Sequence, residues 1–202
     1  MMKMNQVDRM LILGMVLLAG YQVAVGIDGL GTAPILAYTV AFGALVVAGL
    51  LMLILGLEVL ESPAVVIVAT IIPLALAIGL VWQHLAGWRL PFLTFFAVGF
   101  GLVVATRVLP MPGKLPVVVI ALVHGVAGLV IFLLPSVLAA DGSMRPAFAL
   151  VGLGGAMMGL GGLLLSFLRM GQPIVSRAVI LRLLPALLFL MTLAFVAGFA
   201  LG

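Results

Sequence analysis

The two histidines are the first residues to consider for chemistry, because an imidazole can bind haem iron or a metal and can carry a proton. His124 lies about seven residues inside an apolar block, roughly 10 Å from its start at 1.5 Å per residue. His84 lies near the end of another block, roughly 20 Å from His124 across a membrane. The two are therefore too far apart to hold one haem between them. His124 alone could be the axial ligand of a haem or a chlorophyll-type pigment. A hydrogen bond to a neighbouring helix is the simpler interpretation, so we expect no cofactor.

A second group combines aromatic and polar side chains near the ends of apolar blocks, at about the same level as His84. Its members are Tyr21, Gln22, Gln83, His84, Trp88 and Arg89. Such a group could form a pocket for a quinone head or a small solute. Tryptophan is also common where a membrane meets water, so an interfacial belt is the alternative interpretation.

Several other kinds of site are excluded by what the chain lacks. It has no cysteine, which rules out disulfides, thiolate nucleophiles and cysteine-bound zinc. It also lacks the nucleotide-binding P-loop, the HExxH zinc motif and the GxSxG nucleophile elbow. Carboxylates in the middle of a membrane mark ion pathways, but here all of them fall near block ends: Asp8, Asp28, Glu58, Glu61 and Asp141. We therefore expect neither a metal site nor an ion-coupled pump.

The elements that must position these residues are transmembrane helices. Of 202 residues, 66% are apolar and 7% are charged, whereas a soluble domain carries about 25% charged residues. The apolar blocks have the length of a membrane-crossing helix, about 20 residues, and lack the alternation of membrane strands. We predict one all-α domain over residues 1–202, a bundle of about seven transmembrane helices. Their expected ranges are about 10–27, 35–57, 64–85, 90–109, 117–139, 147–168 and 178–201. The first block is too long for a signal peptide, so we expect it to be a retained helix.

Basic residues predict the orientation, because cytoplasmic loops carry an excess of Lys and Arg. One side would hold Lys3, Arg9, Arg107, Lys114, Arg169, Arg177 and Arg182, and the other only Arg89 and Arg145. This bias predicts a cytoplasmic N-terminus and an outer C-terminus in a bacterial-type cytoplasmic membrane. The basic residues are scattered singly, which argues against nucleic acid as a partner.

A charge layer is predicted on the cytoplasmic side, where carboxylates and cations from different loops meet. It consists of Glu58, Glu61, Arg107, Lys114, Arg169, Arg177 and Arg182. Ion pairs between loops would fix their arrangement, and the surplus positive charge would attract anionic lipid. The alternative is a docking surface for a soluble partner.

The sixth block carries a stripe of small residues at helical spacing: Gly152, Gly155, Gly159, Gly162 and Ser166. Such stripes let helix backbones approach closely in lipid. We expect the stripe to pack inside the bundle, and the alternative is a contact with another subunit. Pro73, Pro135 and Pro185 fall inside helices and predict kinks, and Thr70 could satisfy a carbonyl that Pro73 frees.

Two turns resemble each other, at residues 61–67 and 114–120, where a proline is followed by β-branched residues. This similarity would indicate a repeated hairpin, as in many transporters, but proline followed by valine is also frequent in membrane helices generally.

Taken together, these features favour a non-catalytic membrane subunit or scaffold of a larger complex, such as an electron-transfer or light-harvesting assembly. The expected partners are the lipid bilayer and other membrane subunits. A small transporter or binding subunit for an apolar or neutral solute is the alternative, and a single-haem protein or intramembrane enzyme centred on His124 is the third hypothesis. No motif identifies a family.

Overall fold

The computed structural model describes residues 4–109, 111, 113–169 and 175–202, without the side chains of Glu61, Ser166, Phe167 and Arg169. Its long helices are α1 (Gln6–Val25), α2 (Thr32–Leu55), α3 (Pro63–His84), α4 (Arg89–Val108), α5 (Leu115–Ala140), α6 (Ala149–Arg169) and α7 (Arg177–Leu201). All seven are long and apolar enough to cross a membrane, and the described part of the chain contains no strand. The prediction of an all-helical, multi-pass membrane bundle is confirmed.

Several helix ends differ by a few residues from the sequence-based ranges, and local capping explains the differences. α1 begins at Gln6 rather than near residue 10 because Asn5 and Asp8 form a reciprocal capping box. α2 ends at Leu55 because Gly56 takes φ 85°, a left-handed conformation that stops the helix. The polar gap after it forms a short 3-10 helix, η1 (Leu57–Glu61). α6 begins at Ala149, after the 3-10 turn η3 (Pro146–Phe148).

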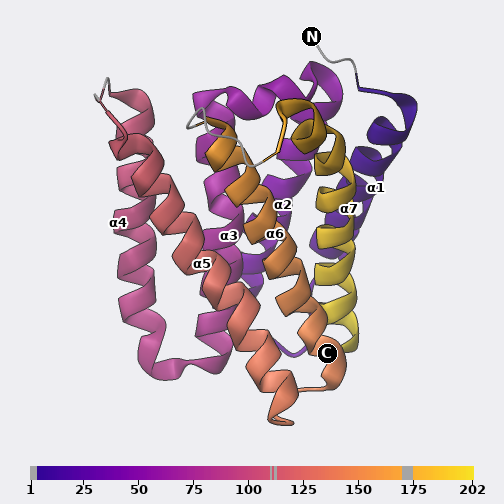
Figure 1. Cartoon of the computed structure of the whole chain (residues 1–202). Helices are drawn as coiled ribbons and strands as arrows, with labels where there is room; N and C mark the ends of the chain where they lie inside the picture. Colours follow the sequence, from indigo (N-terminus) through magenta and orange to yellow (C-terminus); the bar gives the residue numbers. More distant parts are fainter. Residues whose placement is uncertain (1–3, 110, 112, 170–174) are drawn as a thin grey trace.

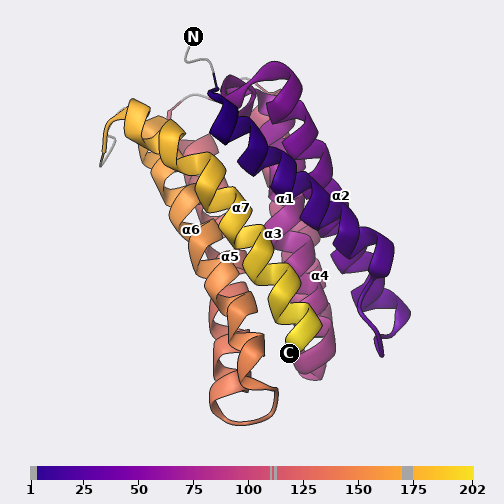
Figure 2. The same ribbon diagram turned by 90° about the vertical axis from the view of Figure 1, so that its right-hand side faces the viewer.

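Six helices form a closed ring in the order α1, α2, α3, α5, α6, α7, and α4 packs outside the ring against α3 and α5 (Figures 1 and 2). α7 contacts α1, so helices from the two ends of the sequence lie side by side. α3 is the most enclosed helix. In the stretch of α3 that is apolar enough to span a membrane, 67% of the residues are buried inside the protein, compared with 22% in the segment that contains α4.

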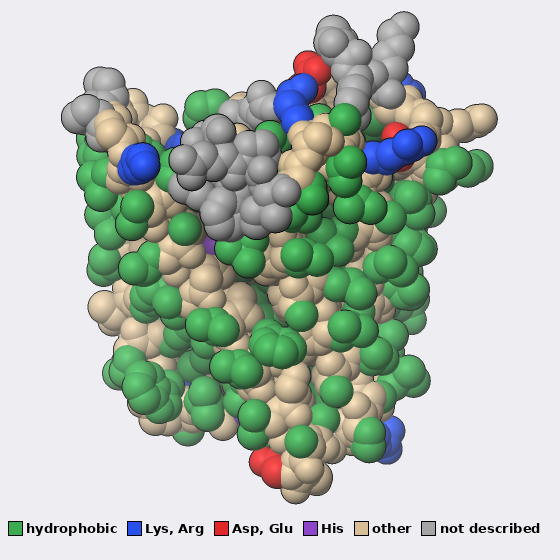
Figure 3. Space-filling model, in the orientation of Figure 1, with side chains coloured by type: hydrophobic (Ala, Val, Ile, Leu, Met, Phe, Trp, Pro, Cys, Tyr) green, Lys and Arg blue, Asp and Glu red, His purple; other side chains and the backbone are tan. Residues whose placement is uncertain are grey.

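The bundle has two faces, which we name by the chain ends that lie near them. The N-terminal face carries the start of α1, η1 and the α4–α5 connection, and the C-terminal face carries the end of α7 (Figure 1). Charged side chains gather at these two ends, while the flank between them is mostly apolar (Figure 3). This distribution is the one that a membrane-spanning bundle requires. Which face is cytoplasmic stays a prediction.

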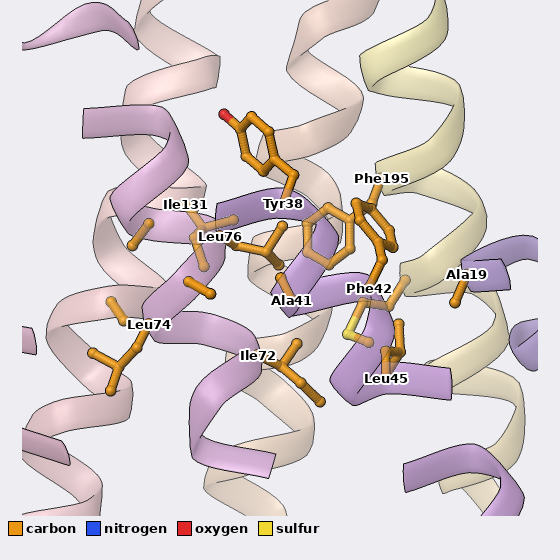
Figure 4. Close-up of a cluster of buried hydrophobic side chains, with 14 of the residues drawn as sticks. Ala19, Tyr38, Ala41, Phe42, Leu45, Ile72, Leu74, Leu76, Ile131 and Phe195 are labelled. Atoms are coloured by element: carbon orange, nitrogen blue, oxygen red, sulfur yellow. The ribbon is translucent and has the colours of Figure 1, made fainter. Parts of the chain in front are cut away.

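Large side chains from α2, α3 and α7 fill the core of the ring. Phe42 of α2 and Phe195 of α7 are almost completely buried, and leucines and isoleucines of α3 lie beside them (Figure 4). Tyr38 belongs to the same cluster, with its hydroxyl group directed away from the phenylalanines (Figure 4).

The three internal prolines lie within helices, as predicted: Pro73 in α3, Pro135 in α5 and Pro185 in α7. The prediction for Thr70 was wrong. Pro73 removes the hydrogen bond to the carbonyl of Ala69, its i−4 residue, but the Thr70 hydroxyl donates to the Val66 carbonyl at 2.7 Å. A threonine in a helix reaches its own i−4 carbonyl, so the hydroxyl group satisfies a different oxygen.

Candidate functional site

The most enclosed polar contact near the C-terminal face joins α2 to α3. The Tyr38 hydroxyl group donates a hydrogen bond to Oε1 of Gln83, and Tyr38 is only 3% exposed. Gly79, one turn before Gln83, makes room for the phenol ring, because a Cβ at that position would overlap it. The two helices therefore approach closely where they share their buried polar pair.

Gln22 brings α1 into the same region. It is 6% exposed, and its amide Nε2 donates to the Gly26 carbonyl at 2.7 Å. A small cavity of about 10 Å³ lies between α1 and α2, and its lining includes Gln22, Tyr38, Thr39 and Phe42. This volume is close to that of one water molecule. Gln22 and Gln83 from the predicted pocket thus lie on opposite sides of Tyr38.

His84 lies beside this polar group but does not join it. Its ring is 5.6 Å from that of Phe148, which is 6.2 Å from the ring of Phe199. Phe199 also packs on Tyr38, with ring centres 4.7 Å apart. Nε2 of His84 is enclosed and has no hydrogen-bond partner. An aromatic cluster therefore closes the C-terminal face, and one imidazole nitrogen at its edge lacks a partner.

The remaining three residues of the predicted pocket lie at its periphery. Tyr21 is 55% exposed and Trp88 is 64% exposed. Arg89 folds back on α3, where its Nε donates to the Trp82 carbonyl at 2.8 Å and its guanidinium lies 5.5 Å from the centre of the Trp82 ring. Exposed aromatic residues at this level are typical of an interfacial belt.

Tyr38 is the site residue that sequence reasoning missed. The chain has only two tyrosines, and a tyrosine within an apolar membrane helix needs a partner for its hydroxyl group. Gln83, near the end of another apolar block, is a polar residue that could supply this partner. That combination was the signal available in the sequence.

His124 lies on α5, half-buried, with Nδ1 3.1 Å from the carbonyl oxygen of Ile120. This contact lies within one helix turn. Among the described residues, no group of three or more metal-ligating side chains comes together. The expectation of no cofactor, with a single haem or pigment at His124 as the alternative, stays a prediction.

The glycine stripe of α6 divides into two halves. In the half toward the C-terminal face, a Cβ on Gly152 would lie 2.8 Å from the Phe132 carbonyl oxygen. A Cβ on Gly155 would lie 2.9 Å from backbone atoms of Ile131 and Phe132. This half therefore forms a tight seam with α5, where only glycine fits.

In the half toward the N-terminal face, both helices carry glycines at helical spacing: Gly159 and Gly162 on α6, and Gly125 and Gly128 on α5. Gly152 and Gly155 lie against residues near Phe132, and α5 and α6 are antiparallel. Continuing this register places Gly159 opposite Gly128 and Gly162 opposite Gly125. Of the described atoms outside each glycine's own helix backbone, none lies within 4 Å of a Cβ built on any of the four. We call these four residues the glycine slot; the side chain of Ser166, the last member of the stripe, lies outside the description.

Cations outnumber carboxylates at the N-terminal face. Of the predicted charge layer, Lys114 and Arg182 are exposed and Arg107 is half-buried; Arg9, which lies outside that predicted set, is exposed on the same face. Glu58 is exposed as well, but it forms no ion pair with another described side chain. Arg177 begins α7 on the same face, whereas Lys3 and the side chains of Glu61 and Arg169 lie outside the described residues. The expected pairing of Glu58 with basic loops is therefore not formed among the described side chains.

The turn similarity has a counterpart in the structure, since α3 and α5 both begin with a proline in the first turn. Both turns lie on the N-terminal face. This shared start is the extent of the correspondence, because the internal prolines fall at different distances along the two helices.

Comparison with models of known protein families, with curated protein sequences and with solved structures found no match to this chain.

Proposed function

We propose that this protein is a non-catalytic membrane subunit that receives a transmembrane helix of another subunit at the glycine slot. The supporting observation is that two antiparallel helices place glycines opposite each other where no described side chain fills the space between them. The slot lies roughly 10–20 Å below the helix ends at the N-terminal face, at 1.5 Å per residue. It is thus within the membrane, where helices and not loops are the partners available.

Glycine on both walls favours a helix as the occupant. Helix association in lipid depends on close backbone packing, which small residues permit. Glycine also weakens an isolated helix by about 0.5–1 kcal/mol relative to alanine. These four glycines have no described atom outside their own helix backbone within 4 Å of a built Cβ, so in the isolated protein they weaken two helices without a compensating contact among the described residues. A partner helix packed on them would supply that contact.

The exposure of the slot is consistent with access from the lipid side. Gly125 is exposed, and Gly128, Gly159 and Gly162 are half-exposed. Leu129 and Leu163, their neighbours on the two helices, are 57% exposed. An incoming helix would find small residues at the centre and leucines at the edges, the arrangement of a packing groove.

The experiment is purification in a mild detergent from the native membrane, with the native mass measured and the co-purifying chains identified. The test variant is the double substitution Gly128→Leu and Gly159→Leu, which fills the slot from both sides. The space around both positions allows the isolated chain to keep its fold. The matched control is Gly101→Leu on α4, which is exposed and has no described neighbour within 4 Å.

A stoichiometric complex with another membrane chain, lost in the slot variant and kept in the Gly101→Leu control, is the expected result. The identity of that chain would name the process. The proposal would be refuted if the wild-type protein is extracted from the membrane without any partner chain, or if the complex persists with both leucines present.

The proposal includes the orientation of the protein, with the N-terminal face in the cytoplasm. Five cations with described positions lie there, namely Arg9, Arg107, Lys114, Arg177 and Arg182, against Arg89 and Arg145 on the other face. Because the chain has no cysteine, single cysteines report orientation cleanly. In intact bacterial cells, a membrane-impermeant thiol reagent should label Ser143→Cys and spare Ser62→Cys. Labelling of Ser62→Cys but not of Ser143→Cys would mean that the protein has the opposite orientation.

A second candidate, a binding subunit for a small neutral solute, is favoured by the polar side chains of Gln22, Tyr38 and Gln83. Gln22 and Tyr38 are buried and line a small cavity, and the half-buried Gln83 accepts a hydrogen bond from the Tyr38 hydroxyl group. Its volume of about 10 Å³ limits the occupant of this conformation to one water. Solute uptake into proteoliposomes that disappears in Gln22→Leu and persists in the exposed-site control Tyr21→Phe would support this candidate. Uptake that is absent from the wild type would remove it.

A further inference from the structure

Arg107 at the end of α4 is held to the start of α5 by a single hydrogen bond. One of its Nη atoms donates to the Pro116 carbonyl at 3.2 Å. A guanidinium carries five N–H donors, and here its Nε is enclosed without an acceptor. The other Nη atom has no acceptor among the described residues. The structure therefore leaves a positioned guanidinium with most of its donors unused.

Lys114 lies at the same corner of the molecule. It is the residue before α5, two positions from Pro116, and its side chain is exposed. Neither Lys114 nor Arg107 forms an ion pair with a described carboxylate. Two positive charges thus lie close together along the chain, and the described part of the protein supplies no counter-charge.

Apolar side chains surround this corner on the membrane side. Leu102 of α4 is 49% exposed, and Val118 and Leu122 of α5 are 57% and 58% exposed; all three lie deeper in the bundle than Arg107 and Lys114. α4 and α5 are joined here and diverge toward the C-terminal face (Figure 1). The corner therefore presents a charged end at the level of lipid headgroups, with an apolar surface directly below it.

We propose that the α4–α5 corner binds the headgroup of an anionic phospholipid, with Arg107 and Lys114 on its phosphate and the exposed apolar residues against its acyl chains. A guanidinium fits phosphate oxygens in a bidentate manner, and a lysine adds a point charge. The two uncompensated cations favour a lipid with net negative charge over a zwitterionic one. The apolar surroundings favour a lipid over an acidic soluble protein, which would not cover the residues below the headgroup level.

The test measures lipid binding by native mass spectrometry of the full chain released from detergent, with phosphatidylglycerol or phosphatidylcholine added. The variant is Arg107→Gln with Lys114→Gln. The matched control is Arg9→Gln with Arg182→Gln, which removes the same charge from two exposed cations on the same face. Each basic residue near a membrane surface contributes on the order of 1 kcal/mol to anionic lipid binding. Removing two should therefore weaken the phosphatidylglycerol complex about thirty-fold.

The expected result is one tightly held phosphatidylglycerol in the wild type and the control variant, and its loss in the Arg107 and Lys114 variant. Equal loss in both double variants would mean diffuse attraction by the whole face and overturn the site. Equal retention of the two lipids in the wild type would overturn the preference for negative charge. Displacement of the lipid by inorganic phosphate would assign the site to a free anion. Arg107→Lys keeps the positive charge. Lipid binding by this variant would show that the loss in the glutamine variant comes from the missing charge and not from misfolding.

Discussion

Two alanine substitutions one turn apart on α6 should have opposite effects on stability. Gly155→Ala places a methyl group 2.7 Å from a methyl carbon of Ile131 and 2.9 Å from the backbone of α5. Gly159→Ala places the same methyl group where no described atom lies within 4 Å. The two positions share one helix and one stripe, so the comparison isolates how closely α5 approaches at each.

The magnitude follows from two terms. Replacing glycine by alanine within a helix gains about 0.5–1 kcal/mol in either variant. Overpacking against a backbone that must shift costs about 1–3 kcal/mol, and only Gly155→Ala incurs that cost. Gly159→Ala should therefore be neutral to stabilising, and Gly155→Ala less stable than it by about 1–3 kcal/mol.

The assay is thermal unfolding of both variants and the wild type in the same mild detergent, supported by reversible unfolding in a denaturing detergent. For a chain of this length, 1 kcal/mol corresponds to roughly 2–4 °C in the midpoint temperature. If Gly159→Ala lowers the midpoint as much as Gly155→Ala does, the seam is closed along its whole length. The glycine slot, and the partner-helix proposal that depends on it, would then be wrong.

Three further predictions concern hydrogen bonds at the ends of helices. Tyr38→Phe leaves the half-buried Gln83 amide oxygen without its donor and should cost about 0.5–1.5 kcal/mol in the free energy of unfolding. Asn5→Ala removes a helix cap and should cost about 1 kcal/mol, seen as faster hydrogen exchange in the first turn of α1. The pKa of Asp141 lies below its ordinary value of 3.8 because Ser143 donates hydrogen bonds to the carboxylate. This stabilisation is present above the unfolded-state pKa and is lost as pH falls through the lower folded-state pKa. Ser143→Ala should raise the pKa of Asp141, measured by carbon NMR of the carboxyl group.

Each of these predictions has a control on the same chain. Tyr21→Phe changes a tyrosine that is 55% exposed and should leave the unfolding midpoint unchanged. Asn5→Ser keeps a capping oxygen and should restore slow exchange. The pKa of Asp141 should stay low in Ser62→Ala, a serine on the opposite face. A Tyr38→Phe variant as stable as the wild type would mean that Gln83 has another donor.

The sequence was sufficient for the helices because each is an apolar block of membrane-spanning length. It was less informative about where helices begin and end. Asn5 caps the start of α1 and Gly56 ends α2, and hydropathy does not measure either effect. It identified Gln22 and Gln83 as polar residues at one level, but not Tyr38 between them. A single chain gives the depth of a residue along its helix, whereas the direction of its side chain depends on which helices are neighbours.

The glycine stripe shows the same limit. Its spacing predicts one face of a helix, but Gly155 and Gly159 look equivalent in the sequence. They differ in how closely described atoms of α5 approach them, which depends on how both helices pack on the rest of the bundle. The position of the Arg107 guanidinium likewise depends on a hydrogen bond to the Pro116 carbonyl of the next helix. No local sequence pattern predicts that contact.

The contact between α1 and α7 has a consequence for the order of events during biosynthesis. A Cβ on Gly14 would lie 2.8 Å from the ring of Phe189, so this contact joins residues that leave the ribosome far apart in time. At about 5–20 residues per second, α1 waits about 10–40 s for its neighbour. During that interval the surface of α1 that meets α7 faces lipid, while α2, the next helix made, already supplies the residues that surround Gln22. The amide of Gln22 also donates to Gly26 within its own helix end, so α1 does not need α7 to satisfy this polar group.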